Sequence, residues 1–406
     1  MTRIVLDISS IFKIKRGIKT GIPRVEFAVF SYLSGMYSGE VAYLIDKPTD
    51  DGFYRVDPND IYAASASTSS RSRIQKLKNS ISKRIRRYSG FKKSTINGSF
   101  EAWKNGDFYL SVSNIWERIS SDDFSALRGR DGLKIALFCH DLAPIVMPHL
   151  YTERARASFS WCLDALSSAD LVICNSFFTQ YELHRLMNLK GHSAVTRVVQ
   201  LNAKIEVLLE QQAVEITCLK ERLYVLSVSS INDRKNYELL LKLWSVFEVD
   251  PEIRDVCLVI VGSKTWGSER VLNRLEMDVS LSDRVFHLSD VSDNTLDWLY
   301  KNCLFTVYPS LYEGWGIPIT ESLSYGKVCV ASSTSSMPEA SSGLGVHIDP
   351  LDFVGWKKEL KKLVTDHEYR SSMEKDIQEK FVPKDWNSVA KEIIEQVLEV
   401  NIDLKN

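Results

Sequence analysis

Two glutamates, Glu313 and Glu321, lie eight positions apart in the most informative stretch of the chain. Ionised carboxylates accept hydrogen bonds from paired hydroxyl groups, such as those of a sugar or a ribose. The residues between the two glutamates include Gly314, Gly316 and Pro318. Glycines let the backbone approach a ligand without an intervening Cβ, and proline suits the first position of a helix. This combination is typical of a site for a phosphorylated, hydroxyl-rich ligand.

The residues around this stretch indicate how it is held. The apolar run 304–308 predicts a strand before it, and a short helical pattern follows it. The start of that helix would present the amides of Gly316 and Ile317, which suits an anion such as a phosphate. Glu321 would then lie in the first helical turn and accept hydrogen bonds from a ribose diol, while Glu313 would face a sugar. The helix dipole alone also favours a glutamate at such a place, but the glycines, the proline and the strand together favour the functional interpretation.

A basic pair follows another predicted strand. The run 224–228 is apolar, and Arg234 and Lys235 come in the loop after it. We expect Asn236 to cap the helix that begins there. Two cations at this place can stabilise a departing diphosphate. A solvated basic pair without function is the alternative.

Other candidates follow strands of the first half of the chain. His140 ends a predicted strand, and its neutral imidazole can donate to a phosphate oxygen or a sugar hydroxyl, or be satisfied within its own loop. Gly17 and Gly21 follow the first predicted strand and are candidates for close backbone approach. Arg24 and Glu26 could belong to the same site or be ordinary residues of a helix N-terminus.

Strand-like and helix-like patterns alternate almost throughout the chain. Strands are predicted at Ile4–Ile8, Val41–Ile45, Phe108–Val112, Lys134–Cys139, Leu171–Cys174, Leu223–Val228, Cys257–Val261, Val285–Leu288, Phe305–Tyr308 and Val328–Ala331. This alternation indicates α/β architecture with parallel sheets covered by helices on both faces. A chain of 406 residues is too long for one ordinary core. We therefore predict two doubly wound domains, residues 1–205 and 223–381, followed by an amphipathic helix within 382–406.

Composition narrows the class of protein. The formal net charge is −1, so no overall attraction to nucleic acid or membrane is expected. The seven cysteines are scattered without a Cys-x-x-Cys pair and are expected to be reduced core thiols. No apolar run reaches the roughly 18 residues that a membrane-spanning helix needs. The chain begins with a strand pattern and not with a signal peptide, so we expect a cytoplasmic protein.

The sequence resembles the retaining glycosyltransferases of family 4, whose signature is a Glu-x7-Glu motif in a Glu-Gly-aromatic-Gly-x-Pro context, as in residues 313–321. The likeness covers nearly the whole chain and is densest in its second half. It implies the GT-B fold, in which two Rossmann-like domains face a cleft and the C-terminal helix returns to the first domain. It also implies transfer of a hexose from a nucleoside diphosphate sugar to a glycan or lipid-linked glycan, with retention of configuration and without a metal or resident cofactor.

The same resemblance assigns roles to residues of this chain. Glu313, His140 and Lys235 would act at the donor sugar and its diphosphate. The residues implied in donor binding are Glu321, Arg234, Gly314, Gly316, Ile317, Ser230, Val291 and Gly21. Many members carry an arginine where Ser229 or Ser230 stands here, and Arg234 could compensate for its absence.

Substrates are less defined than the reaction type. Likeness to polysaccharide mannosyltransferases with an Arg-Lys-Asn loop favours mannose from GDP-mannose in surface polysaccharide (O-antigen) synthesis, ahead of rhamnose or a UDP-sugar. A catalytically silent GT-B protein that binds a glycan or a partner enzyme is the main alternative. A GT-B phosphorylase or epimerase is another.

One segment departs from the average composition. Residues 71–93 contain ten Lys or Arg and no acidic residue, with apolar side chains at spacings of three and four. This pattern predicts a basic amphipathic helix. Such a helix could pack on its own domain, lie on the anionic inner face of a membrane, or bind nucleic acid. We expect one of the first two and no nucleic-acid partner.

Overall fold

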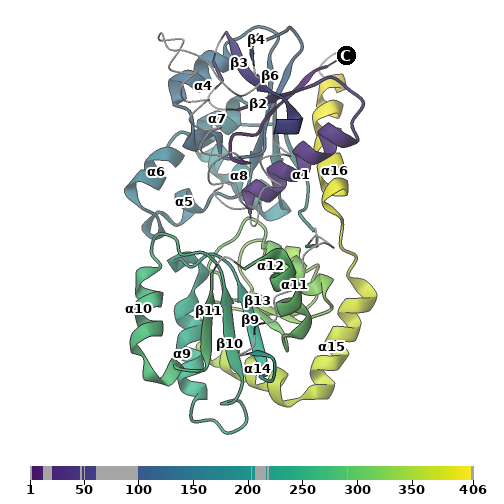
Figure 1. Cartoon of the computed structure of the whole chain (residues 1–406). Helices are drawn as coiled ribbons and strands as arrows, with labels where there is room; N and C mark the ends of the chain where they lie inside the picture. Colours follow the sequence, from purple (N-terminus) through teal and green to yellow (C-terminus); the bar gives the residue numbers. More distant parts are fainter. Residues whose placement is uncertain are drawn as a thin grey trace.

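The chain folds into two α/β domains, one above the other in Figure 1, and the C-terminal helix lies against the upper, first domain. The computed structural model describes residues 2–11, 21–45, 48–49, 51–60, 99–202, 204–205, 216, 219–289 and 291–403. The basic segment 71–93 and Gly17 lie outside these residues, as does part of the stretch between the two predicted domains. The predictions made for them therefore stay predictions.

The first domain is built on an eight-stranded sheet with the order β4-β3-β2-β1-β5-β6-β7-β8. Its strands are β1 (Ile4–Asp7), β2 (Val41–Leu44), β3 (Gly52–Val56), β4 (Ser99–Ala102), β5 (Phe108–Ser111), β6 (Lys134–Cys139), β7 (Leu171–Cys174) and β8 (Thr196–Val198). Its helices are α1 (Ile22–Gly35), α4 (Ser121–Arg128), α5 (Ala143–Val146), α6 (Glu153–Phe159), α7 (Cys162–Ser168) and α8 (Phe177–Leu189). The strand pairs β2–β3 and β3–β4 are antiparallel, and the others are parallel.

The second domain carries a fully parallel sheet with the order β11-β10-β9-β12-β13-β14. Its strands are β9 (Tyr224–Val228), β10 (Cys257–Val261), β11 (Val285–Leu288), β12 (Thr306–Tyr308), β13 (Cys329–Ser332) and β14 (Val346–Ile348). Its helices are α9 (Tyr237–Phe247), α10 (Glu269–Met277), α11 (Asp293–Asn302), α12 (Ile317–Ser324), α13 (Met337–Ala340), α14 (Phe353–Thr365) and α15 (His367–Lys380). This is the strand order of a dinucleotide-binding fold, in which ligands bind where the order reverses.

The point of reversal in each sheet explains where polar residues gather. In the second sheet the order reverses between β9 and β12, so the loops after these two strands meet at one edge. In the first sheet it reverses between β1 and β5. Strands that are buried on both faces, such as β6 and β10, read as continuous apolar runs, which is why the sequence predicted them.

The C-terminal helix α16 (Trp386–Asp403) leaves the second domain and packs along α1 of the first, seen in Figure 1 as the yellow helix beside the purple one. Its side chains Val389, Ile393 and Val397 are fully buried at spacings of four. This apolar stripe joins a core cluster that includes residues of both domains. The predicted GT-B architecture, with two doubly wound domains and a returning helix, is confirmed.

Several strands were not predicted from the sequence. β3, β4, β8 and β14 are three to five residues long and lie at or near the margins of their sheets. Most of β4 is exposed, so its residues show no apolar run. The edge strands β4, β8 and β14 pair with one neighbour each, and strands as short as these four leave little periodic signal in the sequence.

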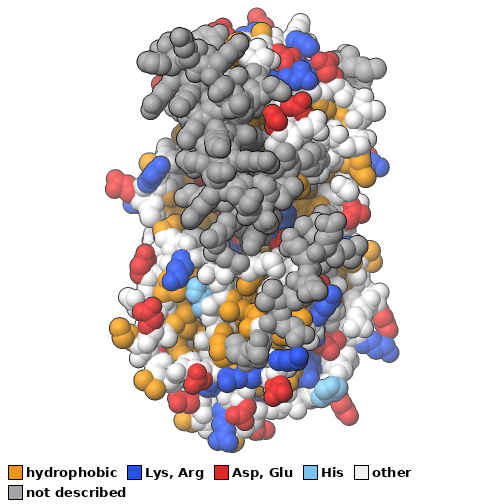
Figure 2. Space-filling view, in the orientation of Figure 1, with side chains coloured by type: hydrophobic (Ala, Val, Ile, Leu, Met, Phe, Trp, Pro, Cys, Tyr) orange, Lys and Arg blue, Asp and Glu red, His pale blue; other side chains and the backbone are white. Residues whose placement is uncertain are grey.

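The described surface carries no dominant charge on the face shown in Figure 2, where acidic and basic side chains are interspersed over both domains. The six cysteines among the described residues are free and buried, as expected of core thiols. Within the described ranges no helix combines the length and apolar character required to cross a membrane.

Candidate active site

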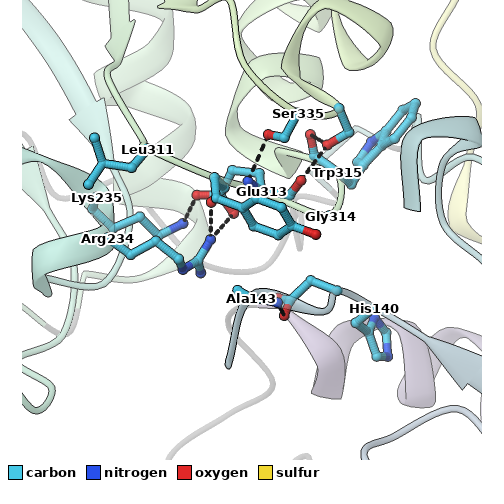
Figure 3. Close-up of polar contacts among 12 residues, drawn as sticks. His140, Ala143, Arg234, Lys235, Leu311, Glu313, Gly314, Trp315 and Ser335 are labelled. Carbon is cyan, nitrogen blue, oxygen red and sulfur yellow. Dashed lines mark hydrogen bonds and ion pairs between the residues drawn. The ribbon is translucent and has the colours of Figure 1, made fainter. Parts of the chain in front are cut away.

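Three charged side chains meet at the edge where the second sheet reverses its order. Arg234 and Lys235 belong to a short 3-10 turn after β9, and Glu313 lies in the loop after β12. Arg234 Nη1 lies 2.8 Å from Glu313 Oε2, and Lys235 Nζ lies 2.5 Å from Glu313 Oε1. Figure 3 shows both cations converging on the one carboxylate. We call these three residues the C-cluster; the sequence had singled out all three.

The C-cluster is buried, and its charges stabilise one another. Burial alone would raise the pKa of Glu313, but Arg234 and Lys235 outweigh it and lower that pKa to about 2. Burial lowers the pKa of Lys235 to about 8. Lys235 also donates a hydrogen bond to the hydroxyl of Tyr308, at 2.8 Å. The side chains in direct contact thus comprise two cations and one carboxylate, which leaves an excess of positive charge for an anionic ligand.

A row of hydroxyl residues after β13 fixes the loop that carries Glu313. Ser335 Oγ accepts the backbone N–H of Glu313 at 2.9 Å. Ser336 Oγ lies 2.9 Å from the carbonyl oxygen of Glu313 and 3.0 Å from that of Trp315. Thr334 donates to the carbonyl of Leu311. The sequence analysis missed these residues, although the hydroxyl run 332–336 after a predicted strand was a signal that could have found them.

Gly314 and Gly316 are each required to be glycine, but for different structural reasons. A Cβ on Gly314 would lie 1.7 Å from the carbonyl oxygen of His140, so this glycine lets the two domains touch. Gly316 has a φ of 111°, a left-handed conformation that glycine adopts without strain, and it precedes α12. The amides of Gly316 and Ile317 thus stand at a helix N-terminus, as the sequence predicted.

Two details predicted for the helix after Gly316 are wrong. Pro318 is the second residue of α12 and not the first, and Glu321 is the fifth, which places it in the second turn.

The predicted cap of the helix after the basic pair is also wrong. Asn236 does not cap α9 through its side chain. It adopts a left-handed conformation with φ of 54°, and its amide donates to the carbonyl of Pro350 instead.

Glu321 is buried, and both its oxygens have partners. Oε1 lies 2.8 Å from Nη1 of Arg24, and Oε2 accepts a hydrogen bond from the Tyr300 hydroxyl at 2.9 Å. Burial raises the pKa of Glu321 above its usual value despite these two partners. Arg24 belongs to α1 of the other domain, so the contact crosses between domains. The sequence left open whether Arg24 has more than a local role, and the structure places it against the motif.

His140 lies across the cleft on the first domain, at the end of β6. Its Nε2 is 2.8 Å from the carbonyl oxygen of Val112, which makes Nε2 the protonated nitrogen. Burial lowers the pKa of His140 to about 4, so the ring is neutral at neutral pH. Figure 3 shows the ring pointing away from Glu313. The predicted donation to a phosphate oxygen needs correction, because the ring proton is engaged and the other nitrogen can only accept, as from a hydroxyl.

The remaining predicted positions are more peripheral. Ser230 lies after β9, and its Oγ accepts a hydrogen bond from the side chain of Asn232. Val291 follows β11 and packs against an apolar cluster of the second domain. Gly21 precedes α1 with a φ of 62°, and the space around its Cβ position is open.

A second buried charged cluster lies at the reversal point of the first sheet. The sequence had named only Glu26 of this cluster as a candidate and did not predict the cluster itself. Arg118 donates two hydrogen bonds to Asp7, at 2.7 and 2.6 Å, and the hydroxyl of Tyr109 donates to the same carboxylate. Glu26 of α1 accepts the backbone N–H groups of Ser10 and Ile11, at 3.1 and 2.9 Å. We call Asp7, Glu26 and Arg118 the N-cluster.

Charges in the N-cluster are balanced differently. Burial raises the pKa of Asp7, but Arg118 outweighs it and the net shift is downward. Burial and the neighbouring Asp7 raise the pKa of Glu26 to about 7. The guanidinium of Arg118 thus contacts Asp7 directly and acts on Glu26 only through its charge. In the part of the chain that the structure covers, no group of three His, Cys, Asp or Glu side chains is placed to hold a metal ion.

Sequence comparison identifies related proteins. Residues 210–380 match the family model of glycosyl transferases group 1. O-antigen chain mannosyltransferase B of Escherichia coli is 27% identical over 237 residues, which span 57% of this chain and 61% of the relative. The serotype-specific mannosyltransferase WbdA of Escherichia coli is 24% identical over 246 residues, or 58% of this chain and 30% of the relative. The chain thus aligns with less than two thirds of the length of these relatives.

Structural comparison extends over the whole fold. Sucrose-phosphate synthase of Thermosynechococcus elongatus superposes with a TM-score of 0.66 at 16% identity, covering 98% of this chain and 99% of that one. Anabaena HepE in complex with UDP and glucose superposes with a TM-score of 0.61 at 14% identity, covering 98% and 100%. At these identities the likeness establishes the fold alone. Residues 210–380, which contain the C-cluster and Glu321, match the model of the group 1 glycosyl transferases, and the two domains have the GT-B fold.

Proposed function

We propose that this protein is a retaining glycosyltransferase that moves a hexose from a nucleoside diphosphate sugar to a glycan or lipid-linked glycan in surface polysaccharide synthesis. The single observation that supports this most is the C-cluster at the reversal point of the second sheet. A diphosphate carries negative charge that grows as the sugar leaves, and the excess cation of the cluster lies where such a ligand binds in this fold. The O-antigen mannosyltransferases among the relatives make GDP-mannose the first donor to test.

In the proposed reaction the bond between the sugar C1 and the diphosphate oxygen breaks, and a bond to an acceptor hydroxyl oxygen forms. The acceptor proton passes to the leaving diphosphate on the same face of the sugar. Glu313 would hold hydroxyls of the donor sugar, and Lys235 with Arg234 would neutralise the diphosphate. The backbone amides of Gly316 and Ile317 would add donors at the start of α12. The protein would then act by positioning and charge stabilisation, without a metal.

The position of Glu313 beside two cations fits the roles proposed for these three residues. The carboxylate is ionised throughout the neutral range, so it can accept from sugar hydroxyls but cannot act as a general acid. His140 is neutral, and its Nδ1 is the ring nitrogen that can accept a further hydrogen bond. Neither group requires a protonation change during the transfer, which fits a reaction in which the diphosphate itself takes the proton.

A thermal-shift screen with GDP, UDP, ADP and TDP tests the donor class, since a ligand that binds the native state raises its melting temperature. A transfer assay with the matching labelled nucleotide sugar and a glycan or lipid-linked acceptor tests the reaction. Stabilisation by one nucleoside diphosphate and an α-linked product from an α-linked donor are expected. A protein stabilised by none of them would contradict the proposal, and activity that is abolished by EDTA would contradict its metal independence.

Docking on an anionic membrane through residues 71–93 is a separate part of the proposal and rests on the sequence alone. Co-sedimentation with anionic but not with neutral vesicles, reversed by high salt, is the expected result.

A further inference from the structure

Arg24 and Glu321 form an ion pair between the two domains at a place where the proposed function needs the carboxylate. Arg24 Nη1 lies 2.8 Å from Glu321 Oε1, and its Nη2 lies 3.4 Å from Oδ1 of Asp293, at the start of α11. The Arg24 side chain is 12% exposed and that of Glu321 is 4% exposed. Little water therefore screens the pair, and its charge-assisted hydrogen bond is correspondingly strong.

The geometry leaves Glu321 little freedom to serve two ligands at once. Oε2 is held by the hydroxyl of Tyr300, whose ring stacks on Tyr325 at 5.2 Å between centroids and 4° between planes. Arg24 takes Oε1. A ribose diol presents two hydroxyl donors to the same carboxylate. Each oxygen can accept about two hydrogen bonds, so the diol has to bind beside Arg24 and Tyr300 in a crowded, buried place or replace Arg24 on Oε1.

We propose that Arg24 and the ribose of the donor nucleotide compete for Glu321, so that Arg24 sets how strongly the site distinguishes a ribose from a nucleoside lacking its hydroxyls. The inference rests on the proposed function, because it takes Glu321 as the ribose-binding carboxylate. Arg24 is thus a specificity-determining residue supplied by the first domain to a donor site on the second.

Displacing Arg24 would not separate the domains, because other contacts join them elsewhere. The carboxylate of Glu339 in α13 accepts the backbone N–H groups of Phe177 and Phe178, at 2.9 and 3.2 Å, from the start of α8. The indole N–H of Trp315 donates to the carbonyl of Leu201. Release of Arg24 would therefore loosen the α1 side of the cleft while the α8 side stays joined.

The test compares binding of GDP and UDP with binding of their 2′,3′-dideoxy forms by calorimetry at pH 8. In Arg24→Gln we expect the better of the two ribonucleotides to bind roughly tenfold more tightly, because no buried charged hydrogen bond has to be broken. The dideoxy form should change less than about twofold. Asp293→Asn, which weakens the ion pair that competes with Glu321 for Arg24, should shift the same ratio in the opposite direction by a smaller factor.

Arg274→Gln is the matched control. Arg274 also bridges two carboxylates, Glu238 at 3.1 Å and Asp278 at 3.3 Å, but within the second domain. Its loss should leave the ratio of ribonucleotide to dideoxynucleotide affinity unchanged. Melting temperatures of all variants show whether they fold, and Asp293→Asn carries the test with Arg24 in place.

The possible results distinguish failure of the competition between Arg24 and ribose from failure of the proposed function. If Arg24→Gln weakens binding of both nucleotide forms equally, Arg24 is a phosphate ligand and the competition does not exist. An unchanged ratio in Arg24→Gln and Asp293→Asn also overturns it, provided the wild type prefers the ribose form. If neither the wild type nor Glu321→Gln distinguishes the two forms, the ribose role of Glu321 itself is wrong.

Discussion

The two domains each bury a charged cluster at the corresponding place in their sheets, and the clusters have opposite charge balance. In the C-cluster, after β9 and β12, two cations surround the single carboxylate of Glu313. In the N-cluster, after β1 and β5, the single guanidinium of Arg118 serves Asp7 while Glu26 lies beside them. Asp141 also acts on Arg234 from across the cleft, but it lies outside ion-pair distance.

The comparison of the two clusters shows that neighbouring charges decide the pKa of a carboxyl group when both carboxyl groups are buried. Glu313 and Glu26 are both buried, and burial pushes the pKa of each upward. Two cations lower the pKa of Glu313 to about 2, whereas the neighbouring Asp7 helps to raise that of Glu26 to about 7. An excess of cation suits a diphosphate, and an excess of carboxylate suits hydroxyl donors. This contrast supports the proposed binding of the diphosphate at the C-cluster.

Removing the central carboxylate of the C-cluster should have the largest effect. Glu313→Gln should lower turnover by a factor of about 10² or more, because an oriented charged contact in a dry site is lost. The nucleoside diphosphate should still bind, since both cations remain. Unfolding should become easier by ~3–5 kcal/mol, because two buried cations lose their partner. Steady-state kinetics, calorimetry and chemical denaturation measure the three quantities.

Glu238→Gln is the matched control for that change. Glu238 is likewise flanked by two arginines, Arg270 at 3.4 Å and Arg274 at 3.1 Å, but away from the cleft. It should keep near wild-type turnover. Wild-type turnover in Glu313→Gln would remove the C-cluster from the active site.

The second prediction separates the two cations of the C-cluster. Lys235→Ala should reduce transfer by roughly 10²-fold, and Arg234→Ala by less, because Lys235 alone occupies the position that the resemblance assigns to a phosphate-binding lysine. Arg234 also donates to the carbonyl of Tyr312, which gives it a structural role in the loop. Initial rates with saturating acceptor measure both. A greater loss in Arg234→Ala would mean that Arg234 has replaced the loop arginine absent at Ser229 and Ser230.

The sequence predicted the C-cluster and not the N-cluster, for a physical reason. Glu313 and Lys235 stand in loops after apolar strands, and glycines and a helix start accompany Glu313, so each has a local signal. Asp7 pairs with a residue 111 positions away, and Arg24 with one 297 positions away. A single aspartate at the end of an apolar strand reads as the end of the strand. Only the topology of the sheet shows that β1 and β5 are neighbours, and only the closed arrangement of the domains shows that Arg24 reaches Glu321.

The same contrast between local signals and long-range contacts applies to the prediction of the fold. Long buried strands and the amphipathic α16 were predicted nearly to their ends, because continuous or periodic burial leaves a pattern in the sequence. The marginal strands were not predicted, because they are short. The conformation of Asn236 was not predicted either, because its amide donates to the carbonyl of Pro350, a contact that the local sequence does not show. The local preference of asparagine predicted a helix cap, whereas its side chain contacts a residue 114 positions away along the chain.

The third prediction uses pH to tell the two clusters apart. The folded pKa of Glu26 lies above its unfolded value, so the folded state binds its proton more tightly. Its contribution to stability is present below about pH 4.5 and is lost as pH rises through about 7, by up to ~3 kcal/mol. Glu313 behaves oppositely: its contribution is present above about pH 4.5 and is lost as pH falls toward about 2.

Glu26→Gln should therefore flatten the dependence of unfolding free energy on pH between 5 and 7, measured by urea denaturation at several pH values. The change at acidic pH below 4, which Glu313 dominates in this comparison, should stay. Glu153→Gln, at the exposed start of α6, should alter neither window. A wild-type protein whose stability does not fall between pH 5 and 7, with Glu26→Gln unchanged from it, would show that the N-cluster does not raise the pKa of Glu26.

The smallest expected effect concerns the hydroxyls that position the C-cluster. Ser336→Ala removes the donor to the carbonyls of Glu313 and Trp315, which should cost ~1 kcal/mol and roughly fivefold in turnover with little change in binding of the nucleoside diphosphate. Ser341→Ala is the matched control, because its hydroxyl donates to the carbonyl of Pro338 away from Glu313. It should cost similar stability without the loss of turnover. Equal losses of turnover in both variants would mean that Ser336 stabilises the domain only, whereas a loss confined to Ser336→Ala, with the nucleotide affinity kept, identifies it as a positioning residue for Glu313. The N-cluster, which has no such hydroxyl contact with the Glu313 loop, should keep its pH response in both variants.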